Sequence, residues 1–255
     1  MPRYARKESS TGVYHVMARG LNKMAIFKET REKTRMLKLI EEHLKDYNMT
    51  ICAYCIMSNH FHLLIKADLN ELASYMAKIL AGYAKYYNFK HNRIGYVFQD
   101  RYKSQCVERE SYFLNCIRYI HMNPSADKSP KKALNYAYSS MKDYYFGRNE
   151  IIKEEVQLYL AEKLCSRKEF MEFHKSSSWD VFEDVAEEAT IEYMRIAKEV
   201  LEHIASKHDV SKLEVLEYVK IRNEYTQELI KVLGKSKKQV ISIEKEIRSN
   251  LTGTG

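Results

Sequence analysis

The sequence predicts an α+β fold, in which an antiparallel sheet of the ferredoxin-like (split βαβ) type is followed by an all-α region with a helix-turn-helix. Before about residue 150, segments of alternating polar and apolar residues are interspersed with segments of helical periodicity, in the order strand, helix, strand, strand, helix, strand, helix. After residue 150 only helical periodicity is found. The apolar content of 45% in 255 residues is sufficient for hydrophobic cores.

Each element of the first part follows from its own residues. Four strands are predicted, at 13–19, 49–57, 60–66 and 102–107, the first of them from its alternating side chains. Apolar residues spaced three and four apart predict three helices, at 30–47, 69–88 and 111–122. The second and third strands are separated only by Ser58 and Asn59, which predicts a hairpin. Pro124 ends the third helix, because proline cannot continue one.

The second part of the chain is expected to contain only helices. Residues 151–178 give one or two helices that connect an N-terminal domain, 1–150, to a helical C-terminal domain, 179–255. The C-terminal domain should contain about four helices. Ser211 and Ser236 are each followed three residues later by Glu or Gln, which is the form of a capping box at the start of a helix.

The last two predicted helices resemble a helix-turn-helix, because a short turn at Gly234 joins them. The second of these helices carries Lys237 and Lys238, which are candidates for contacts to duplex DNA. Residues 231–248 hold six basic and two acidic residues, which favours this interpretation. A small helical bundle that contacts other proteins is the alternative, since 151–255 holds 17 Lys and Arg against 20 Asp and Glu, a net charge of −3.

The positive charge of the chain is concentrated in its first part. Residues 1–150 hold 25 Lys and Arg against 14 Asp and Glu, a net charge of +11, which would attract nucleic acid first and anionic membranes second. No segment approaches the roughly 18 apolar residues of a membrane span, and no apolar segment follows the N-terminus, so a cytoplasmic protein is expected. The five cysteines are an odd number, and we expect reduced thiols.

The most specific motif in the sequence contains two histidines, His60 and His62. His60 and His62 alternate along a strand, so both side chains point to one face, while Phe61 points into the core. Two imidazoles on one face can share a divalent metal ion, or they can simply be exposed histidines. A zinc site with Cys52 and Cys55 is a third interpretation, which fails on geometry because these cysteines face opposite sides of a regular strand.

The second motif lies at the end of the 111–122 helix. Tyr119 and Asn123 are four residues apart and lie one above the other on the same helix face. The tyrosine hydroxyl is a candidate nucleophile, and the asparagine oxygen is a candidate third metal ligand. In the alternative interpretation the tyrosine packs in the core and the asparagine only ends the helix. Tyr112 and His121 lie nearby and could be mistaken for the working groups.

Together with several other short segments of the sequence, these two motifs resemble the REP-associated tyrosine transposases. These are single-tyrosine HUH transposases related to insertion sequence 200-like elements. The resemblance covers most of residues 3–148. The matching blocks are 14–20 with Asn22, 26–27, 57–62, 95–103, 119–124 and 138–140. Two positions depart from the family pattern: Ser58 stands where the family usually has Pro, and Ser125 replaces an apolar residue.

The resemblance implies that 1–150 is a nuclease domain that cleaves and rejoins single-stranded DNA. In the family, the histidine pair and a polar residue four positions after the tyrosine hold Mg²⁺ or Mn²⁺, and these positions match His60, His62 and Asn123. Several relatives use Gln as the third ligand, which is one methylene longer than Asn. Tyr119 matches the nucleophile that forms a 5′-phosphotyrosine link.

The expected partner is single-stranded DNA with hairpin or repeat-type sites, in a cytoplasmic, nucleoid-associated protein without a membrane partner. Relatives include dimers, so a homodimer is a further candidate. Basic candidates for DNA contacts are Arg3, Arg6, Arg19, Arg101, Lys103, Arg118, Lys237 and Lys238, and candidates for base stacking are Tyr83, Tyr86, Tyr87 and Tyr102. Two alternatives remain open: a catalytically silent domesticated nucleic-acid-binding protein, and a helix-turn-helix transcription regulator.

Overall fold

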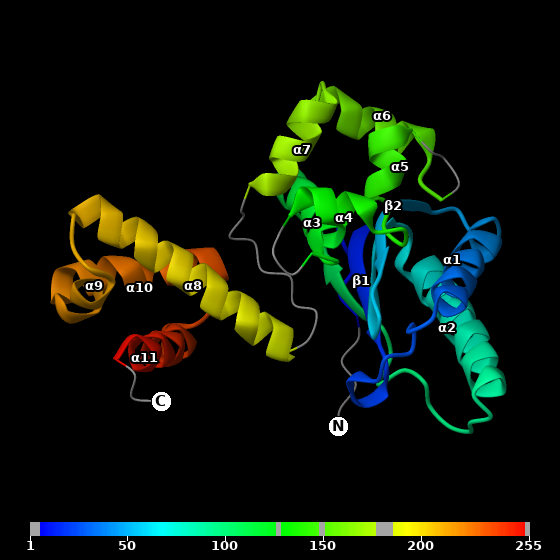
Figure 1. The fold of residues 1–255 in the computed structure, drawn as a ribbon, viewed down its shortest axis with the longest axis horizontal. Helices are drawn as coiled ribbons and strands as arrows, with labels where there is room; N and C mark the ends of the chain where they lie inside the picture. Colours follow the sequence, from blue (N-terminus) through cyan, green and yellow to red (C-terminus); the bar gives the residue numbers. More distant parts are fainter. Residues whose placement is uncertain (1–5, 126–128, 148–150, 177–185, 253–255) are drawn as a thin grey trace. The chain divides into compact units, whose positions relative to one another are not determined.

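The structure, a computed structural model, describes residues 6–125, 129–147, 151–176 and 186–252. The chain divides into two compact units, Met1–Ser176 and Ser177–Gly255. The first unit combines a sheet with helices, and the described residues of the second unit form helices (Figure 1).

A four-stranded antiparallel sheet forms the centre of the first unit, in the order β2-β3-β1-β4. The strands are β1 (Val13–Arg19), β2 (Thr50–Ile56), β3 (His60–Lys66) and β4 (Lys103–Cys106). Helix α1 (Thr30–Leu44) connects β1 to β2, and α2 (Leu69–Lys90) connects β3 to β4. Because β3 lies between β1 and β2, this is the split βαβ arrangement, and the predicted α+β fold is confirmed.

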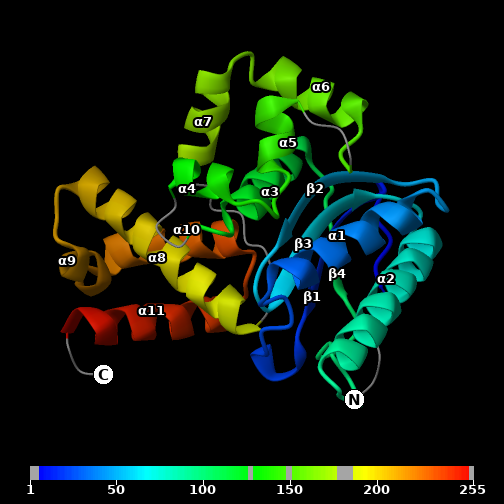
Figure 2. The ribbon, with the colours of Figure 1, turned by 45° about the vertical axis from the view of Figure 1, so that its right-hand side comes forward.

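The two faces of the sheet are covered by different helices (Figures 1 and 2). Helices α1 and α2 lie on one face, where the Phe27 ring contacts Phe61 of β3 and Tyr83 of α2. Helix α3 (Glu110–Met122) lies on the other face and contacts β2 and β3. Because side chains alternate along β3, His60 and His62 point to the α3 face.

Four short helices follow α3 within the first unit. They are α4 (Pro130–Asn135), α5 (Met141–Phe146), α6 (Glu154–Lys163) and α7 (Arg167–Lys175). Helices α4 and α5 were not predicted, because six residues are too few to show a helical period. Helices α6 and α7 fall in the segment that we expected to connect two domains, and they lie within the first compact unit.

The second unit contains α8 (Ala186–His208), α9 (Lys212–Glu217), α10 (Val219–Leu233) and α11 (Lys237–Thr252). These helices share one core, which includes Val200, Leu229 and Ile247. The predicted capping box at Ser211 is present at the start of α9. Across the described parts of the chain, we find no helix with the length and apolar character needed to span a membrane.

Candidate active site

Backbone contacts fix the turn between β2 and β3. The Gly20 N–H donates to the Asn59 carbonyl, and the Phe27 N–H donates to the Ser58 carbonyl, each over 2.8 Å. Since proline also has a carbonyl, this contact does not depend on whether residue 58 is Ser or Pro. A Cβ atom at Gly20 would lie 2.3 Å from the Met24 carbonyl oxygen, so a glycine is required there. The turn is therefore held in place beside the end of β1.

Three histidine rings cluster on the α3 face of the sheet. The ring centroid of His62, which is fully buried, lies 4.8 Å from that of His60 and 5.3 Å from that of His15, on which it stacks. Nδ1 of His62 is 3.2 Å from Nε2 of His15. The Nδ1–H of His60 donates to Oδ1 of Asn59 over 2.7 Å. The Nδ1 atoms of both predicted metal ligands are therefore held by contacts within the protein.

Tyr119 of α3 lies against this cluster. The centroid of its ring is 5.6 Å from that of His62 and 5.9 Å from that of His15, in edge contacts at 82° and 80°. The Tyr119 side chain is only partly buried, whereas Tyr112 on the same helix is buried. Asn123 follows one turn after Tyr119, as the C-cap residue of α3. The structure thus brings the candidate nucleophile next to the histidine pair.

Burial keeps two of these imidazoles uncharged. Burial lowers the pKa of His62 well below its usual value, and the neighbouring His60 and His15 act in the same direction. Burial also lowers the pKa of His15 to about 3. Neutral imidazole is the form that binds a metal ion, and it has one donor and one acceptor nitrogen. If His62 binds a cation through Nε2, its Nδ1–H therefore donates to His15.

The cysteines of β2 do not complete a metal site. A β-bulge between Ile51 and Ala53 interrupts the alternation of this strand, so sequence spacing alone does not fix where Cys52 points. Both Cys52 and Cys55 are buried free thiols, and burial raises the pKa of Cys52 to about 12. Among the residues that the structure describes, no group of three or more His, Cys, Asp or Glu side chains is placed to hold a metal ion. Among these residues, a third protein ligand for the histidine pair would be of another type, such as an amide.

Three basic candidates for DNA contacts lie in the strands β1 and β4 or directly before β4. Arg19 of β1 pairs with His60 of β3, so the two side chains share one face of the sheet, and Nε and Nη1 of Arg19 are buried. Lys103 begins β4, and Arg101 lies just before it. Both are exposed. These two side chains are accessible to a phosphate in solvent.

Two further candidates make contacts inside the first unit. The Arg6 guanidinium lies 3.7 Å from the ring centroid of Tyr102. The Arg118 guanidinium donates to Ser176 Oγ and to Asn115 Oδ1, each over 2.7 Å, and Arg118 is 8% exposed. In this conformation Arg118 contributes to the packing of α3 on α7.

The remaining candidates lie elsewhere. Arg3 is outside the residues that the structure describes. Lys237 and Lys238 are exposed on the first turn of α11. Three of the stacking candidates are buried: Tyr83, Tyr87 and Tyr102.

Sequence reasoning did not single out His15. It lies on the same strand as Arg19, four residues earlier, so alternation places both on one face. That signal was available, but its meaning depends on the pairing of β1 with β3, which brings His15 next to His62. A buried histidine in a strand has no distinguishing pattern of its own.

Comparison with known proteins gives two matches. The family model described as "Transposase IS200 like" matches residues 8–123, a range that contains the three histidines, Tyr119 and Asn123. The solved structure of a REP-associated tyrosine transposase bound to a REP hairpin is 16% identical to this chain, with a TM-score of 0.48, and the match covers 59% of this chain and 90% of that one. No curated protein matches this chain.

Proposed function

We propose that this chain, whose residues 8–123 match the family model described as "Transposase IS200 like", is a metal-dependent transposase that cleaves and rejoins single-stranded DNA at hairpin or repeat sequences through a 5′-phosphotyrosine intermediate. The observation that carries the proposal is the contact of the Tyr119 ring with the rings of His62 and His15. A phenol beside neutral imidazoles combines a nucleophile with ligands for a divalent cation.

His60 and His62 have the chemistry of cation ligands. In metal sites, a ligating histidine usually uses its second ring nitrogen for a hydrogen bond that orients the ring. The Nδ1 atoms of both rings make such contacts, so the two Nε2 atoms would bind the cation. Asn123 is the proposed third ligand. This nitrogen and oxygen donor set suits Mg²⁺ and Mn²⁺, and the imidazoles favour Mn²⁺. Bound there, the cation would polarise a DNA phosphate and stabilise the departing 3′ oxygen.

Tyr119 supplies the nucleophile. Its phenol oxygen forms a bond to the phosphorus of a DNA phosphodiester, and the bond from phosphorus to the 3′ oxygen breaks. The phenol loses its proton, and the departing 3′ oxygen gains one. Because the new link is itself a phosphoester, a 3′-hydroxyl can later reverse the step and join strands without ATP.

The remaining contacts to DNA are assigned to the basic residues. Arg19, Arg101 and Lys103 contact the phosphates next to the scissile one. In the second unit, α10 and α11 form a helix-turn-helix that binds duplex DNA through Lys237 and Lys238. A single-stranded substrate suits the nuclease domain because Tyr119 must approach a backbone phosphate without obstruction by a second strand.

The test is a covalent adduct. A labelled single strand that contains a hairpin, incubated with the full chain and Mn²⁺, should give a protein–DNA adduct that survives denaturation. Tyr119→Phe should abolish the adduct because it lacks the attacking oxygen. Tyr112→Phe, on the same helix, is the matched control and should retain it.

Two outcomes would contradict the proposal. If Tyr119→Phe forms as much covalent adduct as the unmodified chain, Tyr119 is not the nucleophile. A silent nucleic-acid-binding protein or a transcription regulator would bind the same strand and give no adduct with the unmodified chain.

A further inference from the structure

An open groove of about 780 Å³ lies along α1, on the side of the sheet opposite to the histidine cluster. Its lining includes four basic side chains, from Lys28, Arg31, Arg35 and Lys38. The groove also contains two threonines, one acidic residue and Tyr86 of α2. None of the motifs recognised in the sequence includes these cations.

The four cations form a row. Arg31, Arg35 and Lys38 are spaced four and three residues apart, so they share one face of α1 and extend over about 10 Å. Lys28 lies just before the helix. Arg35 is partly buried and contacts Glu42 over 3.3 Å, whereas Lys28, Arg31 and Lys38 are exposed. Successive phosphates of one DNA strand are about 3.4 Å apart along the helix axis, so the three cations on α1 span about three phosphates.

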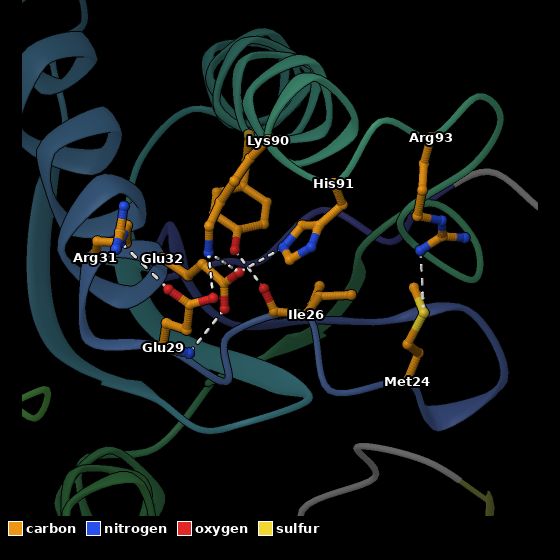
Figure 3. A network of polar contacts seen from close by, with 9 residues as sticks. Met24, Ile26, Glu29, Arg31, Glu32, Lys90, His91 and Arg93 are labelled. Atoms are coloured by element: carbon orange, nitrogen blue, oxygen red, sulfur yellow. Dashed lines mark hydrogen bonds and ion pairs between the residues drawn. The ribbon is translucent and has the colours of Figure 1, made fainter.

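The acidic residue of the groove is neutralised by neighbouring cations. The Glu29 carboxylate accepts from Nε of Arg31 over 3.2 Å and from Nζ of Lys90 over 2.9 Å (Figure 3). With four cations and one carboxylate, the lining has a net charge of +3. Among the described residues, Lys28 and Lys38 have no ion-pair partner. The groove therefore presents positive charge that the protein itself does not compensate.

A buried ion pair joins α1 to the end of α2, the two helices that contribute to the groove. Glu32 of α1 is 1% exposed and accepts from Nζ of Lys90 over 2.5 Å and from Nε2 of His91 over 2.7 Å (Figure 3). Burial acts to raise the pKa of Glu32, but the Glu29 N–H, Lys90 and His91 outweigh it and lower the pKa. The carboxylate is therefore charged, and it ties the start of α1 to the end of α2.

We propose that this groove binds the phosphate backbone of duplex DNA, at a place separate from the phosphate that Tyr119 attacks. The identification of the ligand as DNA, in the form of a hairpin stem, rests on the proposed function. A row of cations with the hydroxyls of Thr30 and Thr34 is the donor set that positions a DNA backbone. Single-strand binding depends on successive aromatic platforms, whereas Tyr86 is the one aromatic residue in this lining and is partly buried.

The test measures how salt affects binding of the full chain to a fluorescent 20-base-pair duplex, without a divalent cation. The variant Lys28→Gln/Lys38→Gln removes the two cations that have no partner in the structure, so it disturbs no ion pair. Each lost phosphate contact should reduce the slope of log K against log salt by about 0.9, which gives about 1.8 for the pair. The matched control is Lys131→Gln/Lys168→Gln, which removes the same charge from exposed positions on α4 and α7.

The proposal predicts a reduced slope only in the groove variant, and a larger loss of affinity for the duplex than for a single strand of the same length. Equal slopes in the groove variant and the control would overturn it. So would a loss confined to the single strand, because the ligand would then be of another kind. Circular dichroism of both variants checks that the fold is retained.

This measurement is independent of the proposed chemistry. If the proposed function fails, the unmodified chain forms no covalent adduct with a hairpin-containing strand. If the groove proposal fails, the adduct still forms, but the salt dependence of duplex binding does not respond to Lys28 and Lys38.

Discussion

At the scale of single residues, His15 links the two groups that the proposed reaction needs. Its Nε2 is 3.2 Å from Nδ1 of His62, and its ring contacts Tyr119. The side chain is buried, so its position is fixed by the packing around it. We infer that His15 is a positioning residue, which holds the His62 ring in the orientation suited to ligation by Nε2.

Removal of this contact should weaken cation binding. We expect His15→Ala to lower the affinity for Mn²⁺ about 10- to 100-fold, the usual effect of losing a hydrogen-bond partner of a metal ligand. Electron paramagnetic resonance of free Mn²⁺ during a titration measures this without any DNA. His15→Gln, whose amide oxygen can accept from His62, should restore part of the affinity. His43→Ala, on the far helix α1, is the control, and an unchanged affinity in His15→Ala would contradict the role.

At the scale of elements, a chain of hydrogen bonds holds α3 against α7. The Phe170 carbonyl can only accept, so Nδ1 of His174 donates to it over 2.7 Å. Nε2 of the neutral His174 then accepts from Nδ1 of His121 over 2.9 Å. Nε2 of His121 in turn accepts from the Ser140 hydroxyl over 2.9 Å. His121 is two residues beyond Tyr119, so this chain fixes the end of the helix that carries the nucleophile.

These bonds require a neutral His174, which makes the stability of the first unit dependent on pH. Burial lowers the pKa of His174 to about 4; the Phe170 carbonyl acts to raise it, and the nearby Arg118 acts to lower it. The unfolded chain has the ordinary value of about 6.5 and therefore binds more protons between these two values. Stability should fall as the pH drops below about 6.5, by about 2 kcal/mol between pH 7 and pH 5 from this group alone.

Urea denaturation at pH 7 and pH 5 measures this contribution. His174→Gln should lose about 2 kcal/mol less than the unmodified chain over this interval, although it is less stable at both pH values. His43→Gln, at a partly exposed position, serves as the control and should keep the full pH dependence. The same pH dependence in His174→Gln and the unmodified chain would show that His174 does not titrate as the structure indicates.

At the scale of the whole molecule, the proposed DNA contacts are distributed over both compact units. Helices α10 and α11 are joined at Gly234, which has a positive φ of 60° that glycine adopts without strain. Lys237 and Lys238 occupy the first turn of α11 and are exposed. In a helix-turn-helix, the N-terminal residues of the second helix approach the DNA. The second unit therefore has a DNA-binding candidate despite its net negative charge.

Duplex binding tests this candidate. Lys237→Gln/Lys238→Gln should reduce the slope of log K against log salt by about 1.8 if each lysine neutralises one phosphate. Lys198→Gln/Lys220→Gln removes the same charge from exposed positions on α8 and α10 and should have no such effect. Equal slopes for the two variants would favour the alternative, in which the helices form a bundle for protein contacts.

Much of the first unit could be predicted because its signals are local. The strands at 13–19 and 60–66 have the predicted bounds, and the second of them begins directly after the Ser58-Asn59 turn. Helices α4 and α5 gave no signal because they are too short. The basic groove was missed for a different reason: three of its four cations lie on one helix and resemble an ordinary solvated face, and only the packing of α2 adds Tyr86 to the lining.

Two pairings can be derived from the printed residues alone: His60 and His62 share one face of a strand, and Tyr119 and Asn123 share one face of a helix, because both follow from the periods of strand and helix. Tertiary packing brings His62 and Tyr119 into contact and places His15 against both of them. That outcome depends on the antiparallel pairing of β1 with β3 and on the packing of α3 against the sheet. Such contacts join residues far apart in the chain. They are stabilised by the burial of apolar surface, which the spacing of residues in the sequence does not reveal.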